Sequence, residues 1–183
     1  KALEAASQTT RRGTYRYVLR RYERELDARG RRVQEEDSRI LRQVLRRPFN
    51  SLDVDDLLSQ GFVRPEGDGS VYYAPDADVL LSDPFLDTHC MNLTKGRDEE
   101  AELLGLAFKP TEDRGVVEIS GVLWLDAQDG HLQSLDYGYE YLDVPNAEGL
   151  GGHVKFEGLP NGTWIISDWS IRMPILTGTV LDG

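Results

Sequence analysis

Residues 115–141 read GVVEISGVLWLDAQDGHLQSLDYGYEY and open the stretch 115–174, which decides the fold and holds all three tryptophans. Apolar and polar side chains alternate on both sides of Asp129-Gly130, a dipeptide that favours the tight turn of a β-hairpin. On the first strand, one face is expected to hold Val117, Ile119, Gly121, Leu123 and Leu125. On the second strand, one face is expected to hold Leu135, Tyr137, Tyr139 and Tyr141. We therefore expect this hairpin to supply much of the core.

The chain around this hairpin repeats the same alternation. Residues 103–108 suit a strand that Pro110 stops, and residues 153–157 alternate cleanly after a loop rich in Gly, Asn and Pro. A turn at 159–162 leads into a long strand over 163–173. On that strand, one face is expected to hold Ile165, Ser167, Trp169, Ile171 and Met173. Successive strands joined by short turns predict an antiparallel meander.

The N-terminal half adds further strands and short helices. Residues 14–27 alternate and precede a turn signal, so we expect a long hairpin strand, whereas residues 37–47 suit a returning strand or a helix equally well. A helix of about two turns is expected at 51–58 with Ser51 as its N-cap, and another behind Asp76. Short strands at 62–63 and 71–74 flank a turn, and Pro84 breaks or restarts the second helix. Four apolar side chains after it are expected to be buried: Phe85, Leu86, Met91 and Leu93.

These elements predict an α+β domain, in which one strongly curved antiparallel sheet of about eight to ten strands, a half-barrel, carries two or three helices on its concave face. We assign residues 1–12 to an N-terminal helix or tether, 13–176 to the single domain and 177–183 to a C-terminal tail. A chain of this length buries roughly 70% of its unfolded surface. Its start at Lys1, without methionine, is typical of a processed or truncated fragment.

Charge is distributed unevenly along the chain. The net charge is −11, which argues against binding to a nucleic-acid backbone. Residues 1–47 nevertheless hold 14 Lys and Arg against 7 Asp and Glu, while residues 48–183 hold 7 against 25. The basic segment 11–47 either lies against the acidic body and partly neutralises it, or binds an anionic partner or membrane surface. No apolar run approaches the ~20 residues of a membrane span.

Few side chains suggest catalysis or metal binding. The single cysteine, Cys90, follows His89, but neighbours in a strand point to opposite faces and neighbours in a helix about 100° apart. A catalytic partner for Cys90 would have to be His131 or His153, and we expect instead a buried structural cysteine beside a hydrogen-bonded histidine. The three histidines lack the spacing of a helical metal motif, so we assign no catalytic residue, metal or cofactor.

The aromatic side chains carry the stronger indication of a site. The tyrosines of one face and the tryptophans together are more aromatic side chains than a single buried face of the sheet would need if the other face were exposed to solvent. Either the sheet is covered on both sides, or one face lines an apolar ligand cavity with hydroxyl and indole groups at its rim. The candidate ligand-binding residues are Trp124, Tyr137, Tyr139 and Trp169.

Part of this pattern resembles a known family. Residues 121–126, followed by Leu132-Gln133-Ser134-Leu135 and Tyr137, resemble the hairpin of bacterial outer-membrane lipoprotein carrier and sorting proteins. The segments 105–110, 151–156 and 161–166, with Trp169 and residues 172–174, are similar to the C-terminal region of uncharacterised bacterial proteins that contain a carboxypeptidase regulatory-like domain.

The resemblance implies a curved half-barrel closed by helices over an apolar cavity for acyl chains, in a protein exported to the periplasm or cell envelope. It also implies an immunoglobulin-like module upstream, and it brings no catalytic residues. The expected function is noncatalytic binding of an apolar or acylated ligand. The alternatives are a structural or interaction module of a larger envelope protein without a cavity, and, less favoured, an enzyme that uses His89 or Cys90.

Overall fold

The computed structural model describes residues 15–26, 33–45, 49, 51–96, 102–144, 147–159 and 164–174. Its strands pair antiparallel and its helices are short, which confirms an α+β domain made mostly of antiparallel sheet. The described strands are β1 (Tyr15–Leu26), β2 (Val33–Leu45), β3 (Val63–Glu66), β4 (Gly69–Tyr72), β5 (His89–Lys95), β6 (Leu103–Pro110), β7 (Glu118–Asp126), β8 (Leu132–Glu140), β9 (Gly151–Gly158) and β10 (Trp164–Arg172). The described helices are α2 (Val54–Gln60), α3 (Ala77–Leu80) and α4 (Asp83–Thr88).

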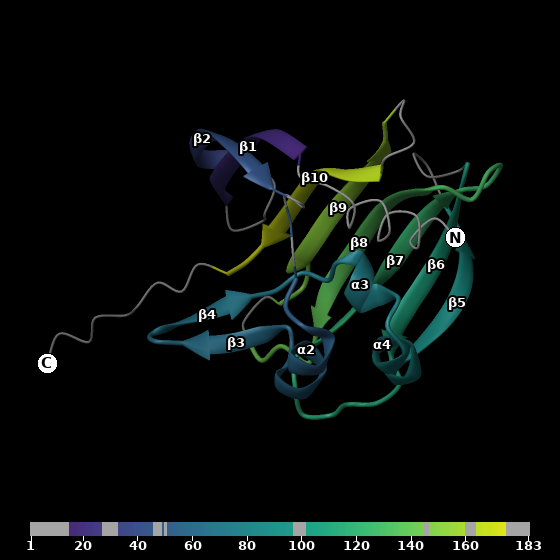
Figure 1. The fold of residues 1–183 in the computed structure, drawn as a ribbon. Coiled ribbons are helices and arrows are strands. Elements are labelled where there is room, and N and C mark those ends of the chain that lie inside the picture. The colour runs from purple at the N-terminus through teal and green to yellow at the C-terminus, as the bar shows by residue number, and fades with distance from the viewer. Residues whose placement is uncertain are drawn as a thin grey trace, which may run out of the picture.

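Six of these strands form the main sheet, in the order β10-β9-β8-β7-β6-β5 (Figure 1). Each is hydrogen-bonded to its neighbour in sequence, so the expected meander is confirmed. The expectation of one continuous sheet of eight to ten strands is wrong, because β1–β2 and β3–β4 are separate two-stranded sheets. Strands β1 and β2 carry charged side chains on both faces, for example Arg20 on one and Glu23 on the other, so much of both faces stays exposed to water.

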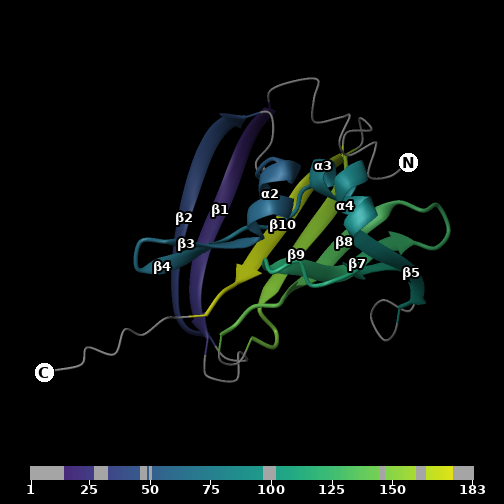
Figure 2. The same cartoon turned by 90° about the horizontal axis from the view of Figure 1, so that it is seen from below.

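The three described helices lie on one face of the main sheet, which we call the covered face (Figures 1 and 2). Side chains of all three helices and of β6 to β9 form the core between these layers. It contains Leu57, Leu58, Phe62, Val79, Leu80, Phe85, Phe108, Ile119, Leu123, Leu135, Tyr137, Tyr139, Val154 and Phe156. The opposite side, the outer face, carries Cys90, Trp124, Asp136 and His153.

Helix α2 begins two residues later than expected from a cap at Ser51. Asp53 is the N-cap, because its Oδ1 accepts a hydrogen bond from the amide of Asp55 at 3.0 Å. Ser51 is therefore not the cap; its hydroxyl donates to the carbonyl oxygen of Ala74 at 2.7 Å and ties the chain before α2 to the chain after β4. Gly61 ends the helix at φ +86°, where a Cβ would come within 3.0 Å of the Val117 backbone.

The segment 75–95 differs more from expectation. Asp76 caps α3 as predicted, and Pro84 restarts the helix as α4 behind the N-cap Ser82. Phe85 is fully buried, but Leu86 and Leu93 are 42% and 73% exposed and Met91 is only partly buried. These exposures contradict the expectation for Leu86 and Leu93. Leu86 follows Phe85 in α4 and therefore points about 100° away from that buried side chain. Leu93 lies on β5, which was not predicted and is an edge strand whose far end none of the described helices covers (Figure 1).

Two β-bulges decide which side chains reach the covered face. In β10 the extra residue is Ser167, so Ile166 pairs with Phe156 and Asp168 with Lys155. The core-facing set is therefore Trp164, Ile166, Trp169 and Ile171, and not the unbroken alternation from Ile165 to Met173. In the β7–β8 ladder a second shift turns Leu132 into the core, where it is 1% exposed.

Strands β1 and β2 form a long hairpin beside β10, with β2 outermost (Figure 2). This resolves the ambiguity of residues 37–47 in favour of a strand up to Leu45. The proposed segments 1–12 and 177–183 lie outside the described residues. Within the described part of the chain, no helix has the length and hydrophobicity to span a membrane.

Candidate functional site

Three of the four candidate ligand-binding residues lie on the covered face. Tyr137 and Tyr139 project from β8, and Trp169 projects from β10 opposite Val154 of β9. Trp124 lies on the outer face, because it pairs with Gly105 and Ser134 and alternates with the buried Leu123. The structure therefore does not bring Trp124 together with the other three.

The two tyrosines are packed against the protein itself. Tyr137 and Tyr139 are 6% and 8% exposed, and their rings meet edge to face with centroids 5.8 Å apart. The Tyr139 hydroxyl donates to the carbonyl oxygen of Tyr73 at 3.1 Å, and its ring contacts Tyr72 at 5.5 Å. Burial raises the pKa of both the Tyr137 and the Tyr139 hydroxyl far above the ordinary value near 10, so both stay neutral.

Two glycines of β9 make room for Tyr137. A Cβ on Gly152 would lie 2.4 Å from the Tyr137 hydroxyl oxygen and 2.5 Å from the Ser170 carbonyl oxygen. Gly151 has a φ of +152°, and a Cβ there would collide with the Tyr137 backbone. The two glycines that begin β9 thus make room for an aromatic ring, whose hydroxyl is buried without a hydrogen-bond partner among the described residues.

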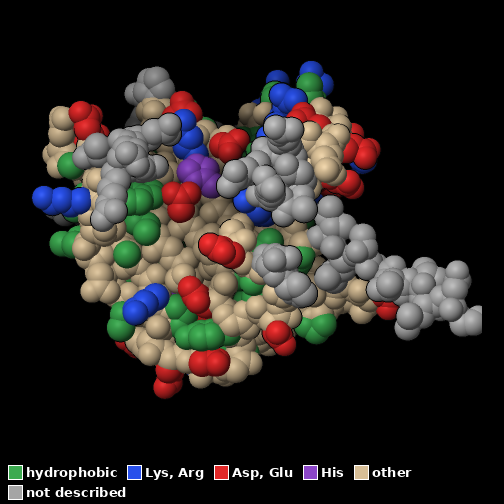
Figure 3. Space-filling model, turned by 180° about the vertical axis from the view of Figure 1, so that it is seen from behind, with side chains coloured by type: hydrophobic (Ala, Val, Ile, Leu, Met, Phe, Trp, Pro, Cys, Tyr) green, Lys and Arg blue, Asp and Glu red, His purple; other side chains and the backbone are tan. Residues whose placement is uncertain are grey.

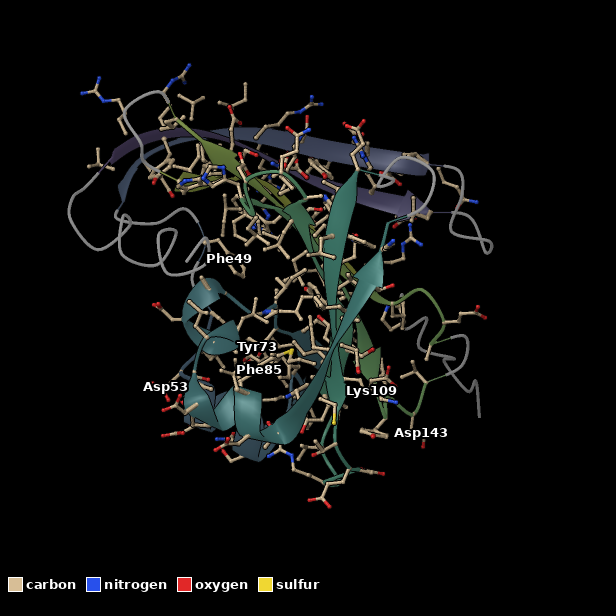
Figure 4. All side chains as sticks on the ribbon, turned by 90° about the vertical axis from the view of Figure 1, so that its right-hand side faces the viewer. Phe49, Asp53, Tyr73, Phe85, Lys109 and Asp143 are labelled. Carbon is tan, nitrogen blue, oxygen red and sulfur yellow. The ribbon has the colours of Figure 1, made fainter. Side chains whose placement is uncertain are left out.

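The β10 end of the covered face is less completely filled. Its core-facing side chains, Trp164, Ile166, Trp169 and Ile171, are only partly buried. Trp169 contacts Phe49, with ring centroids 6.0 Å apart and ring planes at 47°. Figure 4 shows Phe49 on the helix side of the sheet, beneath the β1–β2 hairpin. This aromatic pair therefore lies beside apolar side chains of β10 that keep part of their surface exposed.

The outer face carries a polar arrangement that the sequence did not suggest. The Trp124 indole Nε1–H donates to Asp136 Oδ2 at 2.9 Å, and His153 Nδ1 lies 2.7 Å from Asp136 Oδ1. Gly105 leaves space for the indole, since a Cβ there would be 2.7 Å from Trp124 Cζ3. The ring therefore lies across β6, β7 and β8 on a face where charged and apolar side chains mix (Figure 3).

His89 and Cys90 do not form a catalytic pair. His89 is 4% exposed on the covered face, stacked on Phe85 with centroids 3.9 Å apart, and its ring nitrogens lie 3.0 and 3.2 Å from the carbonyl oxygens of Phe85 and Ile119. Cys90 points to the outer face and is exposed, so the expectation of a buried cysteine is wrong. Successive side chains of a strand point to opposite faces, so a buried His89 places Cys90 on the outer face.

Neither of the other histidines can serve Cys90. His153 lies on β9, four strands away from β5, or about 19 Å at the usual strand spacing. His131, in the turn before β8, lies near the opposite end of β6 from Cys90, and its Nδ1 is 2.7 Å from Asp129 Oδ2. Among the described residues, no group of three or more His, Cys, Asp or Glu could hold a metal ion.

A buried ion pair was also missed from the sequence. Glu118 is fully buried at the start of β7, where Arg114 Nε donates to its Oε1 at 2.7 Å. Its Oε2 has no hydrogen-bond partner in the described structure. Glu118 looked like an ordinary outer-face residue of an alternating strand, and no local signal distinguishes it. Its charge lies near His89, but burial dominates there and lowers the pKa of that imidazole.

In the part of the chain that the structure describes, fold and site together define an α+β domain with a six-stranded antiparallel meander, three short helices on one face and an aromatic cluster beneath them. Comparisons with known proteins give no closer assignment. No family model, curated protein or solved structure matches the chain.

Proposed function

We propose that this domain binds an apolar or acylated ligand without catalysis, at the β10 end of the covered face. One observation carries the proposal: the large apolar side chains of β10 that face this side remain partly exposed, whereas those of β8 are buried. Trp169 and Phe49 form the aromatic border of this region, and Tyr137 and Tyr139 form the packed part next to it.

Apolar contact would supply the affinity. Each Å² of apolar surface removed from water contributes roughly 25 cal/mol, so an acyl chain that covers part of β10 gains several kcal/mol before the costs of ordering it. The described residues of this region contribute no charged group to the core-facing side of β10, which suits a hydrocarbon chain better than a polar substrate.

The wider setting belongs to the same proposal. The hairpin pattern of residues 121–135 supports a likeness to lipoprotein carriers, and with it a half-barrel curvature of the sheet and a location in the periplasm or envelope of a bacterium. An upstream immunoglobulin-like module would then be a neighbour in the same chain.

A second candidate is an interaction module of a larger envelope protein, without a ligand. The filled tyrosine region favours it, because Tyr137 and Tyr139 contact each other and Tyr72 and leave little surface for a ligand. An enzyme based on His89 or Cys90 has no comparable support, since the two side chains lie on opposite faces of β5.

The two candidates can be separated with tryptophan fluorescence. In W124F/W164F the remaining fluorophore is Trp169, on the covered face, and in W164F/W169F it is Trp124, on the outer face. We expect titration with stearic acid that carries a nitroxide in its chain to quench Trp169 strongly and saturably, and Trp124 by less than a tenth as much. Circular dichroism checks that both variants are folded.

Native mass spectrometry of the protein purified from its own host gives an independent measurement, because a bound lipid adds a discrete mass. Equal quenching of both fluorophores, or no quenching together with no added mass, would exclude the ligand site and leave the interaction module.

A further inference from the structure

The β1–β2 hairpin presents a surface with an unusual composition. On one side of its ladder, arginines face aliphatic side chains across the strands: Arg16 pairs with Val44, Val18 with Arg42, and Arg20 with Ile40. We call these six residues the arginine–aliphatic face. Their positions form a checkerboard, in which each cation is surrounded by apolar side chains and each aliphatic group by cations.

This face points away from the rest of the molecule. Val18, Ile40 and Val44 are 66%, 63% and 64% exposed, although each is a β-branched residue that strands usually bury. On the other side of β1, Tyr17 and Leu19 are partly buried. Over residues 16–20 of β1, exposed side chains alternate with partly buried ones, so the arginine–aliphatic face is the more exposed side of this part of the strand.

The face is also electropositive at its open end. Near the turn, Glu36 accepts from both Arg20 at 3.1 Å and Arg24 at 2.6 Å, which neutralises part of the charge. Arg16 and Arg42, at the opposite end, form no ion pair with the described part of the chain and are exposed. Cationic and apolar surface are thus combined where the hairpin is farthest from its own acidic groups.

We propose that the arginine–aliphatic face binds the surface of an anionic phospholipid membrane. Guanidinium groups form paired hydrogen bonds with phosphate oxygens, and short aliphatic side chains between them reach the boundary of the acyl chains. Charge complementarity selects this partner over a neutral bilayer. The inference concerns a surface separate from the β10 region, so it does not depend on the proposed ligand site.

The net charge of −11 does not prevent this contact. Electrostatic interactions between exposed groups are screened over about 8 Å at physiological ionic strength. The pKa of Arg24 is raised by its hydrogen bond to Glu36 and, to a smaller extent, by Asp168 of β10, so acidic groups act on the hairpin near its turn. Arg16 and Arg42 lie toward the other end of two strands that extend for about 40 Å.

Vesicle co-sedimentation tests the proposal. We expect the protein to bind vesicles of equal parts phosphatidylglycerol and phosphatidylcholine, and to bind phosphatidylcholine vesicles at least tenfold more weakly. Raising NaCl from 0.1 to 0.5 M should weaken binding similarly, because the screening length falls to about 4 Å. Each arginine at an anionic surface is worth roughly fivefold in affinity, so R16Q/R42Q should lose about 25-fold and R16E/R42E more.

A matched control exists on the other side of the same hairpin, where two arginines are also exposed. Arg21 and Arg39 pair with each other across the strands, and each already has an acidic neighbour, Glu23 at 2.8 Å and Asp37 at 3.1 Å. R21Q/R39Q changes the net charge as R16Q/R42Q does, and should change vesicle binding by less than threefold. V18S/I40S/V44S tests the aliphatic part and should weaken binding at least tenfold.

Three results would overturn the proposal. One is an equal loss in R21Q/R39Q and R16Q/R42Q, which would indicate a nonspecific charge effect. Another is a loss of vesicle binding in W169F alone, which would place the contact at the ligand region. The third is no binding to anionic vesicles together with self-association that R16Q/R42Q abolishes, which would make an acidic surface of a second copy the partner. Circular dichroism of each variant confirms that it is folded.

Discussion

His89 shows how strongly a single buried group can link this fold to pH. Its ring lies between Phe85 and Phe108 in the core, and burial lowers its pKa below the ordinary value near 6.5. The unfolded chain therefore takes up a proton at a pH where the folded protein does not. The stabilising contribution of the neutral ring is complete above pH 6.5 and is lost as the pH falls below it.

We expect the free energy of unfolding to fall between pH 7.5 and 5.5 with a slope that approaches about 1.4 kcal/mol per pH unit from this one group. Urea unfolding at a series of pH values measures it. In His89→Gln the side chain no longer titrates, so the slope over this range should decrease although overall stability is lower. An unchanged slope in the variant would show that another group is responsible.

At the scale of the element, caps and bulges set the boundaries of helices and the faces of strands. Asp53 caps α2 through its side chain, while Ser51 holds a different hydrogen bond, to Ala74. Asp53→Ala should reduce the free energy of unfolding by about 1 kcal/mol, because an amide at the helix start loses its acceptor. Asp53→Asn is the matched control, since asparagine caps equally well, and urea unfolding should find it within about 0.5 kcal/mol of the original protein.

The same elements show what sequence can and cannot predict. The hairpin of β7 and β8 was predictable because alternation and the Asp129-Gly130 turn agree. The face of β10 was not predictable, because the bulge at Ser167 has no recognisable sequence signal. It places the even-numbered Trp164 and Ile166 on the same face as the odd-numbered Trp169 and Ile171. Strand β5 was missed because its polar and apolar residues do not alternate cleanly, which an edge strand with little coverage tolerates.

Alternation along single strands predicted part of the candidate site, but not the contacts between strands. Tyr137 and Tyr139 share the covered face, as their alternation predicted. Trp124 could be placed on the other side from parity alone, yet its bonds with Asp136 and His153 depend on the register of three strands. Phe49 was not a candidate at all, since a lone aromatic beside a proline carries no periodic signal and its contact with Trp169 joins distant segments.

At the scale of the whole molecule, stability should be unequal between the main sheet and the hairpin. Strands β6, β7 and β8 are central in the sheet and beneath the helices, whereas β1 and β2 form a sheet of their own with mostly exposed side chains. Isolated two-stranded hairpins are marginally stable in water. In hydrogen exchange followed by mass spectrometry, we expect peptides of β1 and β2 to exchange at least a hundredfold faster than peptides of β7.

Slow exchange in β1 and β2, comparable to that of β7, would instead show that the hairpin unfolds together with the main sheet. Addition of anionic vesicles gives a control within the same experiment, because a membrane-bound hairpin should exchange more slowly while β7 is unaffected.

Cys90 offers a practical consequence of its place on the outer side of an edge strand. It is the chain's one thiol, and it is exposed. A maleimide dye or spin label can therefore be attached at a single known position without any mutation. From there, energy transfer or electron paramagnetic resonance can report distances to a second probe on the hairpin or in a bilayer.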